Sequence, residues 1–227
     1  MYDTCQVAGI DEAGRGPIIG PIMVCGVLLS PSRIEVLKRI GVRDSKELSP
    51  RRRTELSFLI YELADEVLVE EIKASQIDLS REQGVSLNEL ERIAFASIVR
   101  RLQPSVVYVD AIGNDPSRFG ERIAQEAGVC GQNCQIISEY KADTRYTVVS
   151  AASVVAKVRR DLAVAEIRRR YGDFGSGYPS DPKTTDFVRS IIVEHGRLPS
   201  FVRRTWQSVN TLIRELDGRA STIQSFG

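Results

Sequence analysis

Twelve residues near the N-terminus constrain this chain most strongly: Gln6–Pro17, with the sequence QVAGIDEAGRGP. A short apolar run at 7–10 changes abruptly to two acids, Asp11 and Glu12. An apolar run of this length, bounded by Gly and Pro, predicts a buried strand. Carboxylates at its end would lie at the edge of a core, where unpaired charge is costly, so we expect a cation beside them. A bound metal and Arg15 are the two candidates, and the alternative is an acidic turn that follows a strand.

The rest of the chain alternates strand-like and helix-like patterns, which indicates an α/β fold with a mixed sheet flanked by helices. Apolar runs predict further strands at 22–29, 66–72, 106–110 and 135–138. The first of these would form a hairpin with the strand at 7–10. Helical spacing, N-cap residues and Gly or Pro stop signals predict helices at about 31–40, 50–63, 86–102, 116–127, 148–171, 183–195 and 205–216.

The length of 227 residues fits one sizeable domain with a small appended lobe. We expect an α/β domain at 1–171 and a C-terminal helical lobe at 172–217 packed on it. The tail at 218–227 is small and polar, which favours a flexible segment. A net charge of +1 gives no global argument for a polyanionic partner, so any nucleic-acid surface must come from local basic clusters.

The sequence contains no targeting signal and no cysteine spacing that indicates a metal site. No apolar run approaches the roughly 20 residues needed to span a bilayer, and the N-terminus lacks a signal-peptide pattern. The four cysteines are scattered and no paired Cys/His set lies near them, which argues against a zinc site. We therefore expect a cytoplasmic protein with reduced thiols and no membrane association. We also expect a monomer.

Acidic residues follow three of the predicted strands: Asp11 with Glu12, then Asp110, then Asp143. Sites in open α/β sheets form at the carboxyl ends of strands, where four carboxylates would repel one another without divalent cations. Oxygen-only ligands favour Mg²⁺ or Mn²⁺, and two such ions about 4 Å apart allow nucleases to activate water. Successive strand residues point to opposite faces, so Asp11 and Glu12 share a metal site only if the strand breaks. Ala13-Gly14 would permit such a break.

Three further features have both a binding and a structural interpretation. Gly14-Arg15-Gly16 would let the backbone approach a ligand closely, although most such tripeptides are turns. Lys46 lies in a polar loop, where it is either a phosphate contact or an ordinary loop lysine. Tyr178 lies in a Gly- and Pro-rich loop, where its ring either stacks on a sugar or base or anchors the loop on the core.

Six motifs, in this order, closely resemble ribonuclease HII, a type 2 ribonuclease H. They are GIDEAGRGP at 9–17, DSK at 44–46, VDA at 109–111, KAD at 141–143, SAASVVAKVRRD at 150–161 and GSGYPSDP at 175–182. The ending FVRRTW resembles the archaeal and eukaryotic branch. The resemblance implies a ribonuclease H-like fold with the catalytic domain at 1–171. It also implies an endoribonuclease that hydrolyses RNA in RNA/DNA hybrids and cuts 5′ to ribonucleotides in duplex DNA, leaving 3′-hydroxyl and 5′-phosphate ends.

The resemblance also implies roles for individual residues. Asp11, Glu12, Asp110 and Asp143 match the family's four metal-binding acids, which hold two Mg²⁺ or Mn²⁺ ions during catalysis. Gly14, Arg15 and Gly16 match the backbone motif that recognises the 2′-hydroxyl at an RNA–DNA junction. Tyr178 matches the tyrosine that stacks on the deoxyribose on the 3′ side, and Lys46 matches a lysine near the phosphates.

Several alternatives remain at this point. Asp161 competes with Asp143 as fourth acid, but it lies four residues after Lys157, a spacing suited to a helical ion pair, so we favour Asp143. Residues 222–226 resemble the core of a sliding-clamp-binding peptide, with Ala220 and Gly227 departing from the usual pattern. A non-catalytic hybrid-binding module, or a DNA nuclease or resolvase of the same fold, is the alternative function. No matched acid is missing, which argues against the first, and the glycine motif with Tyr178 argues against the second.

Overall fold

The computed structural model describes residues 5–42, 48–131 and 134–224. Lys46 lies outside these ranges. The chain forms two compact units, each assembled from separate stretches of sequence. The first comprises Met1–Ala13, Met23–Glu71 and Ser86–Asp161, and the second comprises Gly14–Ile22, Ile72–Val85 and Leu162–Gly227. The C-terminal part that we predicted to begin at Gly172 is therefore joined by two earlier segments, at 14–22 and 72–85.

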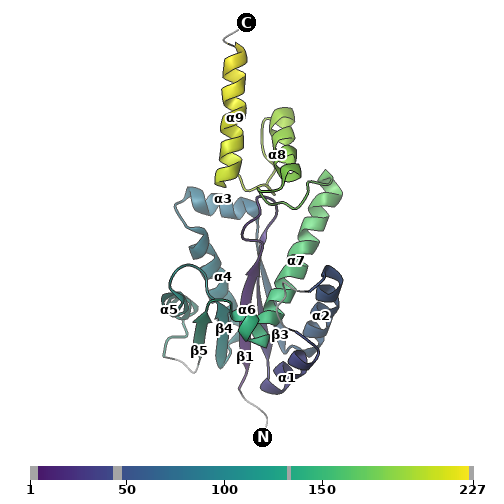
Figure 1. The fold of residues 1–227 in the computed structure, drawn as a ribbon. Coiled ribbons are helices and arrows are strands. Elements are labelled where there is room, and N and C mark those ends of the chain that lie inside the picture. The colour runs from purple at the N-terminus through teal and green to yellow at the C-terminus, as the bar shows by residue number, and fades with distance from the viewer. Residues whose placement is uncertain (1–4, 43–47, 132–133, 225–227) are drawn as a thin grey trace. The chain divides into compact units, whose positions relative to one another are not determined.

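A five-stranded sheet of order β3-β2-β1-β4-β5 carries the fold (Figure 1). Its strands are β1 Val7–Ala13, β2 Ile22–Leu29, β3 Glu66–Ile72, β4 Val106–Asp110 and β5 Gln135–Glu139. β1 pairs with β2 in antiparallel and with β4 in parallel orientation, and β4 pairs with β5 in parallel. The predicted hairpin and mixed sheet are thus confirmed. β1 extends further than predicted, because it continues through both acids to Ala13.

Two glycines show which helices cover the faces of the sheet. A Cβ atom at Gly26 of β2 would overlap Ile98 of helix α4 (Leu87–Leu102). A Cβ atom at Gly9 of β1 would overlap the backbone of Val148, at the start of α7 (Thr147–Tyr171). Gly26 is the partner of Ile10, so it lies on the opposite face from Gly9. One face of the sheet is therefore packed by α4 and the other by the beginning of α7.

The remaining helices are α1 Pro31–Arg39, α2 Pro50–Leu63, α3 Ala74–Glu82, α5 Pro116–Ala127, α6 Ala142–Arg145, α8 Pro182–His195 and α9 Gln207–Gln224. Predicted capping signals act as expected: the Ser86 side chain accepts from the Glu89 N–H, and Gly196 ends α8 with a φ of 65°. Helices α3 and α6 were not predicted. α6 is a single turn, which has no periodicity to detect.

The second unit has its own apolar core. It gathers residues from two distant stretches of chain: Ile18, Ile19, Val164, Phe174, Val188, Val202, Val209 and Leu212. Helix α9 continues to Gln224, which differs from the flexible tail that we predicted from Gly218. One glycine inside a helix costs only about 1 kcal/mol relative to alanine, so Gly218 need not end it. None of the described helices is long and apolar enough to cross a membrane.

Candidate active site

Three aspartates meet at the carboxyl ends of β1 and β4. Ile10 pairs with Val109, so the next residues, Asp11 and Asp110, lie side by side on neighbouring parallel strands. Asp143 comes from helix α6. Among the described residues, these three form a group in which one carboxylate oxygen from each lies within 4.8 Å of the others. The structure thus brings together three of the four acids that we predicted to bind metal.

The backbone around α6 directs Asp143 toward Asp110. Lys141 adopts a left-handed conformation with a φ of 55°, which turns the chain after β5. The following N–H, of Ala142, donates to Asp110 Oδ1 at 2.9 Å. The Ser150 hydroxyl donates to the Asp143 carbonyl and so ties α6 to α7. Asp110 is therefore both a member of the carboxylate group and the acceptor that fixes the helix bearing Asp143.

The electrostatics of this group suit it to a cation. Asp11 and Asp143 are buried, at 4% and 2% exposure. Burial and then the neighbouring Glu12 charge raise the pKa of Asp11 well above its usual value, and Asp110 raises it further, against hydrogen bonds from Ser153 and the Glu12 N–H. Buried carboxylates this close must hold a proton or a cation. Because all the donors are hard oxygens, the group fits Mg²⁺ or Mn²⁺.

Glu12 is not part of the group of three. Regular β1 pairing continues through Glu12, which lies opposite Val24, so alternation turns it to the face opposite Asp11. The strand ends only after Ala13, where Gly14 takes a φ of 96°. The Glu12 charge nevertheless acts on Asp11, since it is the second largest contribution to the raised pKa. A role for Glu12 as metal ligand stays a prediction.

Asp161, the competing fourth acid, is placed elsewhere. Its Oδ2 lies 3.2 Å from Arg53 Nη2 of α2, and its Oδ1 lies 3.8 Å from Arg160 Nη1. The Arg53 side chain is largely buried and also donates to the Leu48 carbonyl. The structure therefore gives Asp161 a structural ion pair and brings Asp143 to the carboxylate group.

The glycine motif and Tyr178 lie in contact within the second unit. A Cβ atom added to Gly16 would lie 3.1 Å from Tyr178 Cε1, so the ring packs against the glycine backbone. The Gly177 carbonyl accepts from the N–H groups of Ile18 and Ile19, at 2.8 and 3.3 Å, which ties the two loops together. Tyr178 is 43% exposed, so it does not anchor its loop in the core. Two motifs far apart in the sequence thus form one surface.

Comparisons with known proteins match this arrangement to one family. The family model described as ribonuclease HII matches residues 8–209. The chain belongs to the ribonuclease HII family. It is accordingly an endoribonuclease, a hydrolase of phosphodiester bonds. The ribonuclease HII of Methanothermobacter thermautotrophicus is 45% identical over 90% of this chain and 97% of the relative.

Solved structures agree with the family assignment. The crystal structure of the ribonuclease H2 from Pyrococcus horikoshii OT3 has a TM-score of 0.86 and 39% identity, and covers 92% of this chain and 98% of that chain. Ribonuclease HII in its complex with PCNA, from Archaeoglobus fulgidus, has a TM-score of 0.81 and 38% identity, covering 91% and 96% of the two chains. The ribonuclease H-like fold predicted from the motifs is thus confirmed, and these relatives are archaeal.

The sequence analysis did not identify a pair of hydrogen-bonded polar side chains beside the three aspartates. Lys157 Nζ donates to Ser153 Oγ at 3.0 Å, and the buried Ser153 hydrogen bonds to Asp11. Both residues lie on α7, one helical turn apart. The i, i+4 spacing of Ser153 and Lys157 within the small-residue half of the helix is the signal that would have identified the pair.

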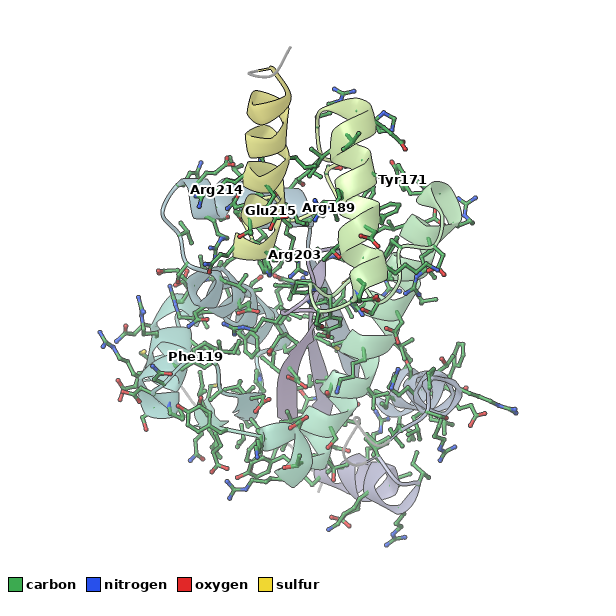
Figure 2. The ribbon with its side chains drawn as sticks, turned by 45° about the horizontal axis from the view of Figure 1, so that its top comes forward. Phe119, Tyr171, Arg189, Arg203, Arg214 and Glu215 are labelled. Carbon is green, nitrogen blue, oxygen red and sulfur yellow. The ribbon has the colours of Figure 1, made fainter. Side chains whose placement is uncertain are left out.

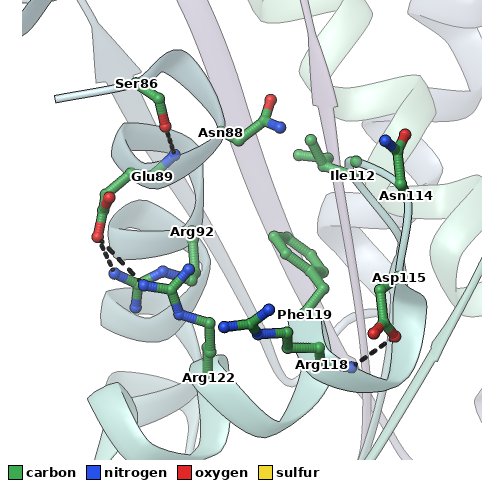
Figure 3. A pocket seen from close by; sticks show the side chains of 11 residues that line it. Ser86, Asn88, Glu89, Arg92, Ile112, Asn114, Asp115, Arg118, Phe119 and Arg122 are labelled. Carbon is green, nitrogen blue, oxygen red and sulfur yellow. Dashed lines mark hydrogen bonds and ion pairs between the residues drawn. The ribbon is translucent and has the colours of Figure 1, made fainter.

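A cavity of about 300 Å³ lies next to the loop that follows β4 (Figure 3). It is lined by Ser86, Asn88, Glu89, Arg92, Ile112, Gly113, Asn114, Asp115, Arg118, Phe119 and Arg122. Although three arginines line it, Glu89 lies 2.8 Å from Arg92 and 3.6 Å from Arg122, and Arg92 also pairs with Glu126. Since carboxylates pair with two of these arginines, the cavity is not by itself a site for an anion.

Proposed function

We propose that this ribonuclease HII cleaves the RNA strand of RNA/DNA hybrids and cuts 5′ to ribonucleotides embedded in duplex DNA, leaving 3′-hydroxyl and 5′-phosphate ends. The observation that carries the proposal is the meeting of Asp11, Asp110 and Asp143 within 4.8 Å, from a strand end, a second strand end and a one-turn helix. Buried like charges destabilise the fold, and an apolar cluster at the same place would stabilise it better. The three aspartates are therefore better explained by function than by structure.

The three aspartates would hold the metal ions, and Glu12 is the candidate for a further ligand. Two Mg²⁺ or Mn²⁺ ions bound there would supply an activated water and stabilise charge on the leaving oxygen. The chain's own contribution is orientation. The Ala142 N–H fixes one oxygen of Asp110, and the Glu12 N–H holds Asp11 Oδ1 at 2.8 Å. These hydrogen bonds hold the carboxylates in place before substrate arrives.

Discrimination of RNA from DNA is assigned to the surface formed by Gly14–Gly16 and Tyr178. The 2′-hydroxyl is the group that distinguishes a ribonucleotide at a given position. Glycine lets backbone N–H and C=O groups approach it without a side chain in between. The Tyr178 ring packs on Gly16 and keeps an exposed face, which supports stacking on the sugar that follows. Lys46 would contact a phosphate, but it lies outside the described residues.

The decisive experiment is cleavage of a DNA duplex that contains one ribonucleotide, in Mg²⁺ or Mn²⁺, with an all-DNA duplex alongside. We expect one cut 5′ to the ribonucleotide and none in the all-DNA duplex. Asp11→Asn should bind the substrate without cutting it. The matched control is Asp161→Asn, the same change at the carboxylate that pairs with Arg53, and it should keep its activity.

Each alternative has its own outcome in this assay. Binding without cleavage by the wild type would favour the non-catalytic hybrid-binding module. Cutting of the all-DNA duplex would favour a DNA nuclease or resolvase. Undiminished cleavage by Asp11→Asn would remove Asp11 from the metal site.

We further propose a monomer in the cytoplasm that binds a sliding clamp through its C-terminal residues. Support comes from the ribonuclease HII of Archaeoglobus fulgidus, whose structure was solved in a complex with PCNA. In this chain, the clamp-like residues 222–224 are helical, and 225–227 lie outside the described residues. Deleting 219–227 should abolish capture by an immobilised clamp and leave cleavage unchanged. Capture that survives the deletion would place the clamp contact elsewhere.

A further inference from the structure

Arg203 has no assigned role in the site, yet its side chain hydrogen bonds to the backbone of the glycine motif. The side chain is fully buried in the second unit (Figure 2). Its guanidinium donates three hydrogen bonds to backbone carbonyls: Nη2 to Gly14 at 2.6 Å, Nη1 to Arg15 at 2.9 Å and Nε to Gly20 at 3.0 Å. Two of these carbonyls belong to the residues that we assign to recognition of the 2′-hydroxyl.

Only arginine supplies this combination of donors. The guanidinium is planar, always charged and carries its N–H groups in a fixed fork, so the positions of its three acceptors are fixed relative to one another. The guanidinium Cζ lies 4.9 Å from the centre of the Trp206 ring, which covers one face of the guanidinium. A lysine at this position would keep the charge, but it would lose both the plane and the fork.

The backbone of Arg203 is itself held firmly. Its N–H donates to the Ile18 carbonyl at 2.8 Å, and the preceding residue, Val202, forms a β-bridge with Ile19. The residues that follow it are held by Asp78, which is buried and accepts from the N–H groups of Arg204 and Thr205, at 3.0 and 2.9 Å. The guanidinium is therefore a fixed support rather than a mobile side chain.

We propose that Arg203 is the positioning residue that presets the Gly14–Gly16 backbone for the ribose 2′-hydroxyl; this inference rests on the proposed function. A carbonyl and the following N–H share one rigid peptide plane. Fixing the carbonyls of Gly14 and Arg15 therefore also fixes the directions of the Arg15 and Gly16 N–H groups. Those N–H groups lie in the motif assigned to the ribose, so the rigid fork of Arg203 sets how sharply ribose is distinguished from deoxyribose.

The test measures discrimination directly. All proteins carry Asp11→Asn so that duplexes stay intact, and affinity is compared for a duplex with one ribonucleotide and for the same duplex made of DNA alone. In Arg203→Lys, we expect the preference for the ribonucleotide duplex to fall roughly tenfold, the equivalent of one well-aligned hydrogen bond. Affinity for the all-DNA duplex should not change, and neither should Mn²⁺ binding when Arg203→Lys is made in the protein with Asp11 intact. The control is Arg204→Lys, since Arg204 pairs with Glu82 at 2.8 Å and should leave the preference intact.

The outcomes separate this inference from the function on which it rests. If the protein with Arg203 intact shows no preference for the ribonucleotide duplex, the proposed recognition of ribose fails. If it shows the preference and a folded Arg203→Lys keeps it, the positioning role of Arg203 is overturned alone.

A second measurement keeps Arg203 in place, so it does not depend on the folding of the variant. The Arg203 Nε–H resonance should shift on addition of the ribonucleotide duplex and not of the all-DNA duplex. Equal shifts with the two duplexes would also overturn the inference.

Discussion

Replacing Asp11 with asparagine should stabilise the metal-free protein while abolishing cleavage. Three carboxylates lie within 4.8 Å of one another, and two unit charges at that distance repel by about 3 kcal/mol at an effective dielectric constant of roughly 20. The wild type relieves part of this repulsion by binding protons. The substitution should therefore raise the free energy of unfolding by less than this, about 1–3 kcal/mol. The asparagine keeps an oxygen to accept from the Glu12 N–H, so little hydrogen bonding is lost.

The pH dependence of this gain follows from the raised pKa of Asp11. A carboxyl group with a raised pKa in the folded state contributes stability that is fully present below its unfolded pKa, about 3.9, and is lost as pH rises through the folded pKa. Without metal, the wild type should therefore lose stability relative to Asp11→Asn as the solution becomes less acidic. With Mg²⁺, the wild type should become the more stable of the two proteins, because a bound ligand stabilises only the protein that can hold it.

Thermal unfolding in EDTA at pH 8 measures this difference in stability. The unfolding midpoint of Asp11→Asn should lie roughly 3–10 °C above that of the wild type for a chain of this size. The matched control is Asp78→Asn, at another buried aspartate. There the carboxylate accepts hydrogen bonds on both oxygens, and an amide nitrogen would face an N–H donor. Asp78→Asn should therefore lower the midpoint. An Asp11→Asn protein that is equally or less stable than the wild type in EDTA would refute the account of the carboxylate group.

The remaining predictions test individual contacts. Asp143→Asn should abolish Mn²⁺ binding measured by calorimetry, whereas Asp161→Asn should leave it within a few-fold of the wild type, and equal effects would contradict the assignment. Gly16→Ala should raise KM for the ribonucleotide duplex, because its Cβ would lie 3.1 Å from Tyr178 Cε1, and unchanged kinetics would show that the ring moves freely. Thr184→Val should lower stability by about 1–3 kcal/mol in thermal unfolding, because the buried Thr184 hydroxyl accepts from the Gly177 N–H and donates to the Phe174 carbonyl.

The parts of the fold with local signals could be predicted from the sequence. The hairpin of β1 and β2 follows from two apolar runs joined by a glycine-rich turn, and α4 follows from its N-cap Ser86 and regular apolar spacing. Three acids of the predicted site could be found because each follows a strand whose end lies at the same edge of the sheet. Alternation also indicated the difficulty with Glu12 before the structure showed regular pairing through it.

The parts without local signals could not be predicted. The one-turn helix α6 shows no periodicity, yet its left-handed Lys141 and the Ala142 N–H determine where Asp143 points. The pairing of Arg53 with Asp161 links α2 to α7 across 108 positions, so no short-range pattern indicates it. In each case the deciding contact is tertiary, and a pattern read over a few residues contains no information about it.

Arg203 shows what this means for the recognition of ribose. It lies 189 positions from Gly14, and in sequence it is one of two adjacent arginines of which the other is exposed. A glycine-rich tripeptide has many backbone conformations available, and the entropy of restricting them opposes any single binding geometry. The three hydrogen bonds from Arg203 offset that cost during folding rather than during binding. Under the proposed function, the glycine motif is only half of a recognition element. Transplanting it without the arginine that holds its carbonyls should then transfer the sequence but not the discrimination.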